Sequence, residues 1–141
     1  MGFETKFNFK FDIVNFDFGY TYLEVDDMND LDPMFYRPKH KIVAKTSLDQ
    51  QFARHSFIVK YQSEQDYQDF LSDDYVFLGS EIKFPVNQLE GLMLVDYVAM
   101  FKFETMDLSL KIKNIFDVEY ELIQDYPMPG RMISLNYEMK F

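Results

Sequence analysis

Acidic side chains crowd one short segment of the chain, Val25–Pro33 (VDDMNDLDP). Carboxylate oxygens are good calcium ligands, and a dedicated calcium loop spaces them as D-x-[DN]-x-[DN]-G. This segment breaks that register, because Met28 and Leu31 stand where ligands or a glycine would be required. We therefore interpret it as a solvated loop; loose binding of calcium, or of divalent ions that bridge lipopolysaccharide, is the alternative.

Residue types that often carry catalysis are few and scattered. His40 and His55 lie far apart, and neither has a carboxylate in a spacing typical of a metal or catalytic pair. The chain has no cysteine, so it can form neither a disulfide nor a thiolate metal site. It also has no glycine-rich phosphate loop and no Ser/His/Asp arrangement typical of a triad. We therefore expect no enzyme activity, no metal centre and no cofactor.

The charge balance argues against nucleic acid as a partner. Lys and Arg number 14 against 24 Asp and Glu, which gives a net charge of −10. A phosphate-binding surface needs an excess of cations. Just over half of the acidic residues fall in segments 26–38, 64–74 and 117–125, so we expect the negative charge to lie mainly in loops.

A proline-rich turn precedes the last apolar stretch. Segment 127–130 (PMPG) combines prolines, which fix φ, with a glycine, which relieves the backbone, and Arg131 follows it. Arg131 is then free to pair with a loop carboxylate. A weaker hypothesis makes Arg131, Tyr126 and Tyr67 contacts to a ligand at a loop rim.

Alternating apolar and polar residues predict that the elements carrying these side chains are β-strands. Seven strands are expected, at Phe3–Phe11, Val14–Val25, Lys39–Asp49, Ala53–Gln65, Leu92–Phe103, Met106–Phe116 and Arg131–Phe141. Short connections (12–13, 50–52, 104–105) alternate with long ones (26–38, 66–91, 117–130). Outer-membrane barrels show this alternation between tight periplasmic turns and extended outer loops.

The same alternation predicts one lipid-facing and one lumen-facing side of the sheet. Aromatics make up 18% of the chain, which fits girdles at the membrane interfaces. The lipid-facing candidates are Phe7, Phe9, Phe11, Phe16, Phe18, Tyr20, Tyr22, Ile42, Ala44, Leu48, Phe57, Val59, Tyr61, Val95, Tyr97, Ala99, Phe101, Phe103 and the apolar positions of the last two strands. The lumen-facing candidates include Lys6, Asn8, Lys10, Lys41, Lys45, Ser47, Ser56, Lys60, Asp96 and Lys102.

The C-terminal third resembles the closing hairpin of TonB-dependent outer-membrane receptors. The resemblance rests on NIFDVEY (114–120), YPMPGR (126–131) and a last strand that ends on Phe141, and further on RPKH (37–40) and LVDY (94–97). It implies a plugged, 22-stranded barrel that takes up a bulky nutrient (ferric siderophore, cobalamin, haem or glycan) with TonB-coupled energy. It also implies outer-membrane lipid as the surrounding solvent.

The 141 residues are too few for such a barrel, whose strands alone need about 220 residues at roughly 10 per strand. No plug, TonB-contacting segment or signal peptide is recognised in the sequence. We therefore expect residues 1–141 to be the C-terminal part of the barrel, about its last seven strands, which forms an open curved sheet if isolated. TonB would then act only through an N-terminal part that this sequence does not include.

The last strand carries the one motif to which the resemblance gives a role of its own. Tyr137, Met139 and Phe141 alternate along it, and in the family this signature is what the barrel-assembly machinery recognises, by pairing with an exposed strand edge. The same three residues are also plain lipid-facing positions.

Segment 75–84 (YVFLGSEIKF) has strand propensity but would break the alternation of connections if it crossed the membrane. We interpret it as extended structure in the long loop, such as a hairpin. Counting it as a strand gives the first alternative, a self-contained outer-membrane barrel of about eight strands. The second is a soluble β-sandwich or lipocalin-like binding module, which would have to bury Phe9, Phe18, Phe101 and Phe103 against one another.

Overall fold

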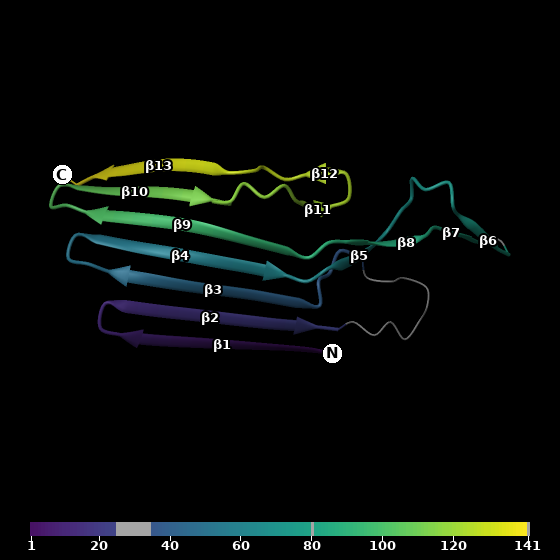
Figure 1. Ribbon diagram of the computed structural model, residues 1–141, viewed down its shortest axis with the longest axis horizontal. Helices are drawn as coiled ribbons and strands as arrows, with labels where there is room; N and C mark the ends of the chain where they lie inside the picture. Colours follow the sequence, from purple (N-terminus) through teal and green to yellow (C-terminus); the bar gives the residue numbers. More distant parts are fainter. Residues whose placement is uncertain (25–34, 80, 141) are drawn as a thin grey trace.

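Seven long strands form one antiparallel sheet in the computed structural model, which describes residues 1–24, 35–79 and 81–140 (Figure 1). The strands follow one another across the sheet in the order β1-β2-β3-β4-β9-β10-β13. Their bounds are β1 Gly2–Phe11, β2 Val14–Leu23, β3 His40–Asp49, β4 Ala53–Gln62, β9 Leu92–Lys102, β10 Met106–Lys113 and β13 Met132–Met139.

The short connections all lie at one end of this sheet and the long ones at the other (Figure 1). Every neighbouring pair of strands is antiparallel. β1 and β13 form the two edges, and both run toward the end with the short turns. The predicted open antiparallel sheet and its alternating connections are confirmed.

Several strands end earlier than the sequence predicts. β10 stops at Lys113 instead of Phe116, because Asn114 and Asp117 adopt the left-handed conformation with φ of 52° and 55°. That conformation turns the chain out of the ladder. β4 stops at Gln62, and one further backbone bond, from the N–H of Ser63 to the carbonyl of His40, follows its end.

The long connection from β4 to β9 forms an arm of two short ladders. β5 (Gln65–Gln68) pairs with β8 (Val86–Leu89) at its base, and β6 (Val76–Leu78) pairs with β7 (Glu81–Lys83) at its tip. Segment 75–84 is therefore a hairpin outside the main sheet, as predicted, and the eight-stranded closure is not formed. The last connection, predicted as a plain loop, carries a small hairpin of β11 (Glu121–Ile123) and β12 (Tyr126–Pro127).

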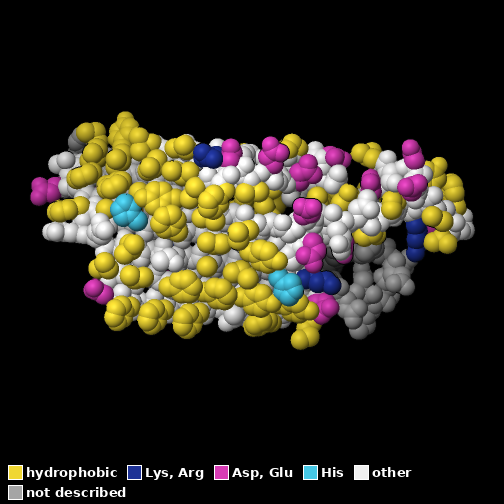
Figure 2. Space-filling model, in the orientation of Figure 1, with side chains coloured by type: hydrophobic (Ala, Val, Ile, Leu, Met, Phe, Trp, Pro, Cys, Tyr) yellow, Lys and Arg dark blue, Asp and Glu magenta, His cyan; other side chains and the backbone are white. Residues whose placement is uncertain are grey.

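The register assigns the side chains to two faces, because directly opposed residues of an antiparallel pair lie on the same side. One row runs from Phe9 through Phe16, Thr46 and Phe57 to Tyr97. All the predicted lipid-facing residues within the long strands share this face, which we call the apolar face. Figure 2 shows hydrophobic side chains over the seven strands on this side, with acidic residues gathered beyond the strand ends toward the arm.

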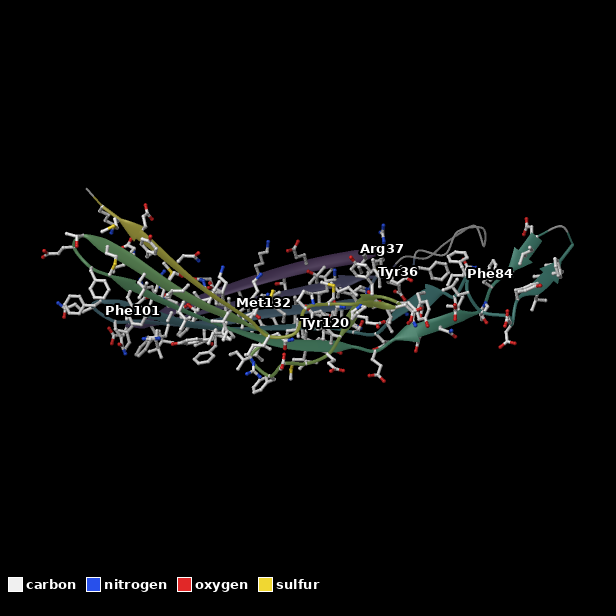
Figure 3. All side chains as sticks on the ribbon, turned by 90° about the horizontal axis from the view of Figure 1, so that it is seen from above. Tyr36, Arg37, Phe84, Phe101, Tyr120 and Met132 are labelled. Carbon is white, nitrogen blue, oxygen red and sulfur yellow. The ribbon has the colours of Figure 1, made fainter. Side chains whose placement is uncertain are left out.

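The sheet is a single layer (Figure 3). Few large apolar side chains are buried among the described residues, and Phe9 and Phe103 remain 53% and 47% exposed. A sandwich or lipocalin would seal these rings in an interior, so the soluble alternative does not agree with the structure. None of the described residues forms a helix long and apolar enough to cross a membrane.

Candidate functional site: the polar face and the outer rim

The second side of the sheet, which we call the polar face, is rich in lysine. It carries all the residues predicted to face the lumen, because the register places each of them on the side opposite to the apolar row. Its cations are Lys6, Lys10, Lys41, Lys45, Arg54, Lys60, Lys102, Lys111, Lys113 and Lys140, and its carboxylates are Glu4, Asp17, Asp49, Asp96, Asp107 and Glu138. The polar face is therefore basic although the whole chain is strongly acidic.

Among the described residues of this face, Asp96 on β9 is the one buried carboxylate. It is only 6% exposed, and its Oδ2 accepts a hydrogen bond from Lys60 Nζ on β4 at 2.6 Å. Its Oδ1 accepts the backbone N–H of Asn114 at 3.0 Å. A buried charge needs this kind of partnership, because the desolvation cost must be offset by ion pairing and hydrogen bonds. Asp96 thus ties two strands of the sheet to the start of the last long connection.

Asn114 continues the network into that connection. Its side-chain carbonyl accepts the N–H of Val118 at 3.0 Å, and its amide donates to the Val118 carbonyl at 2.9 Å. Asp117 then joins the two ends of the connection, since its Oδ1 accepts the N–H of Arg131 at 2.6 Å and its Oδ2 lies 4.0 Å from the Arg131 guanidinium. A Cβ on Gly130 would lie 2.6 Å from Asp117 Oδ1, so a side chain there would force the Asp117 carboxylate to shift.

The base of the arm is fastened to the same region. Gln65 is buried and its amide donates to the carbonyl of Leu122 at 2.9 Å, which links β5 to β11. The Tyr36 ring stacks on Tyr67 with 6.1 Å between centroids, and the N–H of Tyr36 donates to the Asp66 carbonyl. These contacts bring all three long connections together at one end of the sheet, where they form one rim, which we call the outer rim.

The residues proposed as rim contacts have different surroundings. Tyr67 is 7% exposed and packed against Tyr36, Arg131 is held by Asp117, and Tyr126 is exposed on β12. Tyr137 and Met139 are exposed on β13, at the open edge of the sheet. Phe141 and the acidic segment Val25–Pro33 lie outside the described residues.

The two histidines lie on the apolar face, each beside a tyrosine. The Tyr20 hydroxyl lies 2.9 Å from Nδ1 of His40, and the Tyr97 hydroxyl lies 2.7 Å from Nδ1 of His55. In the part of the chain that the structure describes, no group of three or more metal-ligating side chains comes together. These histidines therefore complete aromatic rows of the sheet.

The sequence pattern predicts Asp96 on the lumen side and Asn114 at a strand end, but it does not predict the hydrogen bond between them. A signal was present: Asp96 is the only charge inside the apolar run Leu92–Met100, and such a residue usually has a specific partner. The roles of Gln65 and Tyr36 had no such signal, since both depend on how two distant connections meet.

A comparison with models of known protein families gives no match, and neither does one with curated protein sequences. Solved structures do match. The siderophore receptor PirA from Acinetobacter baumannii aligns with a TM-score of 0.74 and 18% identity, over 96% of this chain and 20% of the receptor. The G324V mutant of the ferric enterobactin receptor PfeA from Pseudomonas aeruginosa aligns with a TM-score of 0.70 and 15% identity, over 96% of this chain and 21% of the receptor.

The chain thus spans about a fifth of the length of the receptors that it matches. At this identity the likeness concerns the fold. It agrees with the resemblance carried by the C-terminal motifs, and with a single sheet that has one apolar and one polar face. The chain has the fold of a seven-stranded segment of the β-barrel of outer-membrane siderophore receptors.

Proposed function

We propose that the chain forms part of the barrel wall of an outer-membrane receptor that takes up a bulky nutrient with TonB-coupled energy. The nutrient class is a ferric siderophore, cobalamin, haem or a glycan. The proposal rests on the two faces of the sheet, one apolar and the other lysine-rich, and on the position of all long connections at one end. The activity is transport and not catalysis.

In this proposal the apolar face contacts outer-membrane lipid and the polar face lines the lumen. Lipid-facing and lumen-facing residues alternate along the strands of such barrels. The outer rim, with segments 66–91 and 117–130, faces the exterior and forms a sector of the ligand-binding surface. Arg131, Tyr126 and Tyr67 are the candidate contacts there, and Tyr67 is the one that lies mostly covered, stacked on Tyr36.

We also propose a role in assembly for the β13 edge. Tyr137 and Met139 present alternating apolar side chains on a strand that has a partner on one side only, β10. An exposed strand edge is recognised by addition of a further strand. In this proposal the barrel-assembly machinery recognises these two residues together with Phe141. The plug and the TonB contact belong to parts of the receptor outside this sequence.

A chimeric receptor tests the proposal. Residues 1–141 replace the matching fifth of PirA, and the control is PirA carrying its own segment re-inserted through the same cloning junctions. We expect the chimera to reach the outer membrane and to expose the arm, residues 65–89, to protease on intact cells. We further expect nutrient-dependent growth through the chimera to be lost when TonB is deleted.

Two results would count against the proposal. A chimera that fails to assemble while the control assembles would show that this sheet is not a barrel wall. A chimera that supports uptake equally well without TonB would show that transport through this barrel wall does not depend on TonB-coupled energy.

A further inference from the structure

The tip of the arm carries a chain of aromatic rings. Phe70 contacts Phe84 edge to face with 5.3 Å between centroids, and Phe84 lies 6.1 Å from Tyr75. Tyr75 in turn contacts Phe77 at 5.5 Å. These four residues, with Leu71 and Val76 beside them, form a continuous apolar surface that we call the arm tip.

The arm tip is exposed and stands apart from the sheet. Leu71 and Phe77 are 86% and 65% exposed. Among the described elements, β6 and β7 contact only each other. A lone two-stranded hairpin is marginally stable in water, and a contiguous exposed apolar patch typically marks an interaction site. Figure 1 shows the tip projecting beyond the ends of the seven strands.

Its shape favours a macromolecular partner over a small ligand. The tip is a narrow ribbon of two three-residue strands, whereas small-molecule sites are concave and enclose most of the ligand. A projecting knob with aromatic anchors is suited to contact the surface of a second protein.

The charges around the tip indicate what that surface carries. Asp69, Asp73, Asp74 and Glu81 flank the aromatic rings, and Lys83 is the one cation in this stretch of the sequence. Figure 2 shows acidic side chains next to the apolar ones at this end of the molecule. Complementary potentials steer association and fix partner choice. An anionic lipid surface would be repelled by the same carboxylates.

We propose that the arm tip is a docking site for a second protein that presents an apolar surface flanked by lysine and arginine. The partner packs its apolar surface on Tyr75, Phe77 and Phe84, and its cations pair with the surrounding carboxylates. This inference goes beyond the transport role and does not depend on it, because it needs only the exposed hairpin.

Binding of a labelled amphipathic peptide to the full chain in detergent micelles tests the proposal. The probe is a leucine–lysine peptide, and its partner probe is a leucine–glutamate peptide with the same spacing of leucines. One variant removes the rings (Tyr75→Ser with Phe77→Ser) and a second removes the charges (Asp73→Asn, Asp74→Asn and Glu81→Gln). The matched control makes the same kinds of change near the short turns (Phe52→Ser with Glu104→Gln). The peptide partitions into the micelles equally with all four proteins. Differences in peptide affinity between the proteins therefore report on the arm tip.

We expect each arm variant to bind the leucine–lysine peptide about tenfold more weakly than the parent chain, and the control to bind it equally well. Equal binding by the arm variants, or equal binding of the leucine–glutamate peptide, would overturn the proposal. The fluorescence of a Phe77→Trp variant distinguishes a bound protein from other possible occupants of the arm tip. Its emission should shift to the blue only when the peptide is added. A blue shift with phospholipid vesicles alone would overturn the proposal in favour of a lipid surface. A blue-shifted emission without any addition would overturn it in favour of another part of this chain that covers the tip.

Discussion

The apolar and the polar face of the seven-stranded sheet are stabilised by different side-chain contacts. On the apolar face, cross-strand neighbours are rings and aliphatic chains, such as Phe57 and Tyr97 with 5.0 Å between centroids. On the polar face they are hydrogen-bonded pairs, such as Ser47 and Ser56 at 2.9 Å. No second layer covers either face among residues 1–24, 35–79 and 81–140. This difference supports the proposal that one face contacts hydrocarbon and the other contacts water or polar groups.

Removing the hydrocarbon solvent should have the largest effect. The apolar face and the two edge strands β1 and β13 are exposed, and unpaired edges beside an apolar surface promote aggregation. We expect the purified chain to aggregate in plain buffer and to run as a discrete species in detergent, as measured by size-exclusion chromatography with light scattering. A monodisperse monomer in buffer would mean that the apolar face has found an internal partner.

Charge placed on neighbouring residues of β4 should distinguish the two faces. Val59 lies on the apolar face and Ile58 on the polar face, opposite Lys45 and Asp96. Val59→Lys is expected to lower the free energy of unfolding in lipid by about 2–4 kcal/mol, the cost of a cation near the bilayer midplane. Ile58→Lys should cost less than about 1 kcal/mol. Urea titrations of both variants give the comparison, and equal losses would remove the distinction between the faces.

The ion pairs of the polar face should differ with their burial. Asp96→Ala removes the partner of Lys60 and the acceptor of the Asn114 N–H, and we expect it to cost about 1–2 kcal/mol because Lys60 stays half exposed and can be rehydrated. The matched change Asp107→Ala breaks an exposed pair with Lys140 and should cost about 0–1 kcal/mol. Hydrogen exchange is the second readout, and it should rise at residues 114–118 only in Asp96→Ala. Faster exchange there in both variants would disprove the specific role of Asp96.

The smallest expected effect concerns the closure of the last connection. Gly130→Ala pushes a methyl group against Asp117 Oδ1, and we expect a cost of about 1 kcal/mol, relieved when Asp117→Ala is combined with it. Gly19→Ala is the control: its added Cβ would meet nothing closer than a carbonyl at 3.9 Å, so no loss is expected. If the losses in free energy of unfolding from Gly130→Ala and Asp117→Ala simply add in the double variant, residues 117 and 130 are not in contact.

Strand patterns were predictable because each side chain in the sheet depends mainly on its own period-2 position. The seven strands, the two faces and the side of the sheet occupied by Lys60 and Asp96 all followed from this local rule. The hairpin β11–β12 did not, since Pro127 in β12 reads as a turn residue. The contact of Gln65 with Leu122 was also not predictable, because it joins residues far apart in sequence and belongs to no local pattern.

In the proposed barrel, one face of the sheet contacts hydrocarbon and the other does not. The chain contains no tryptophan, so a single Trp can report on each face. Ile42 and Val43 are adjacent aliphatic residues of β3 on opposite faces, Ile42 beside Tyr20 and Tyr61, and Val43 beside Gly19 and Lys60. In bilayers with bromine on the acyl chains, fluorescence of Ile42→Trp should be strongly quenched and that of Val43→Trp should not. Equal quenching at the two positions, or none at either, would contradict the account.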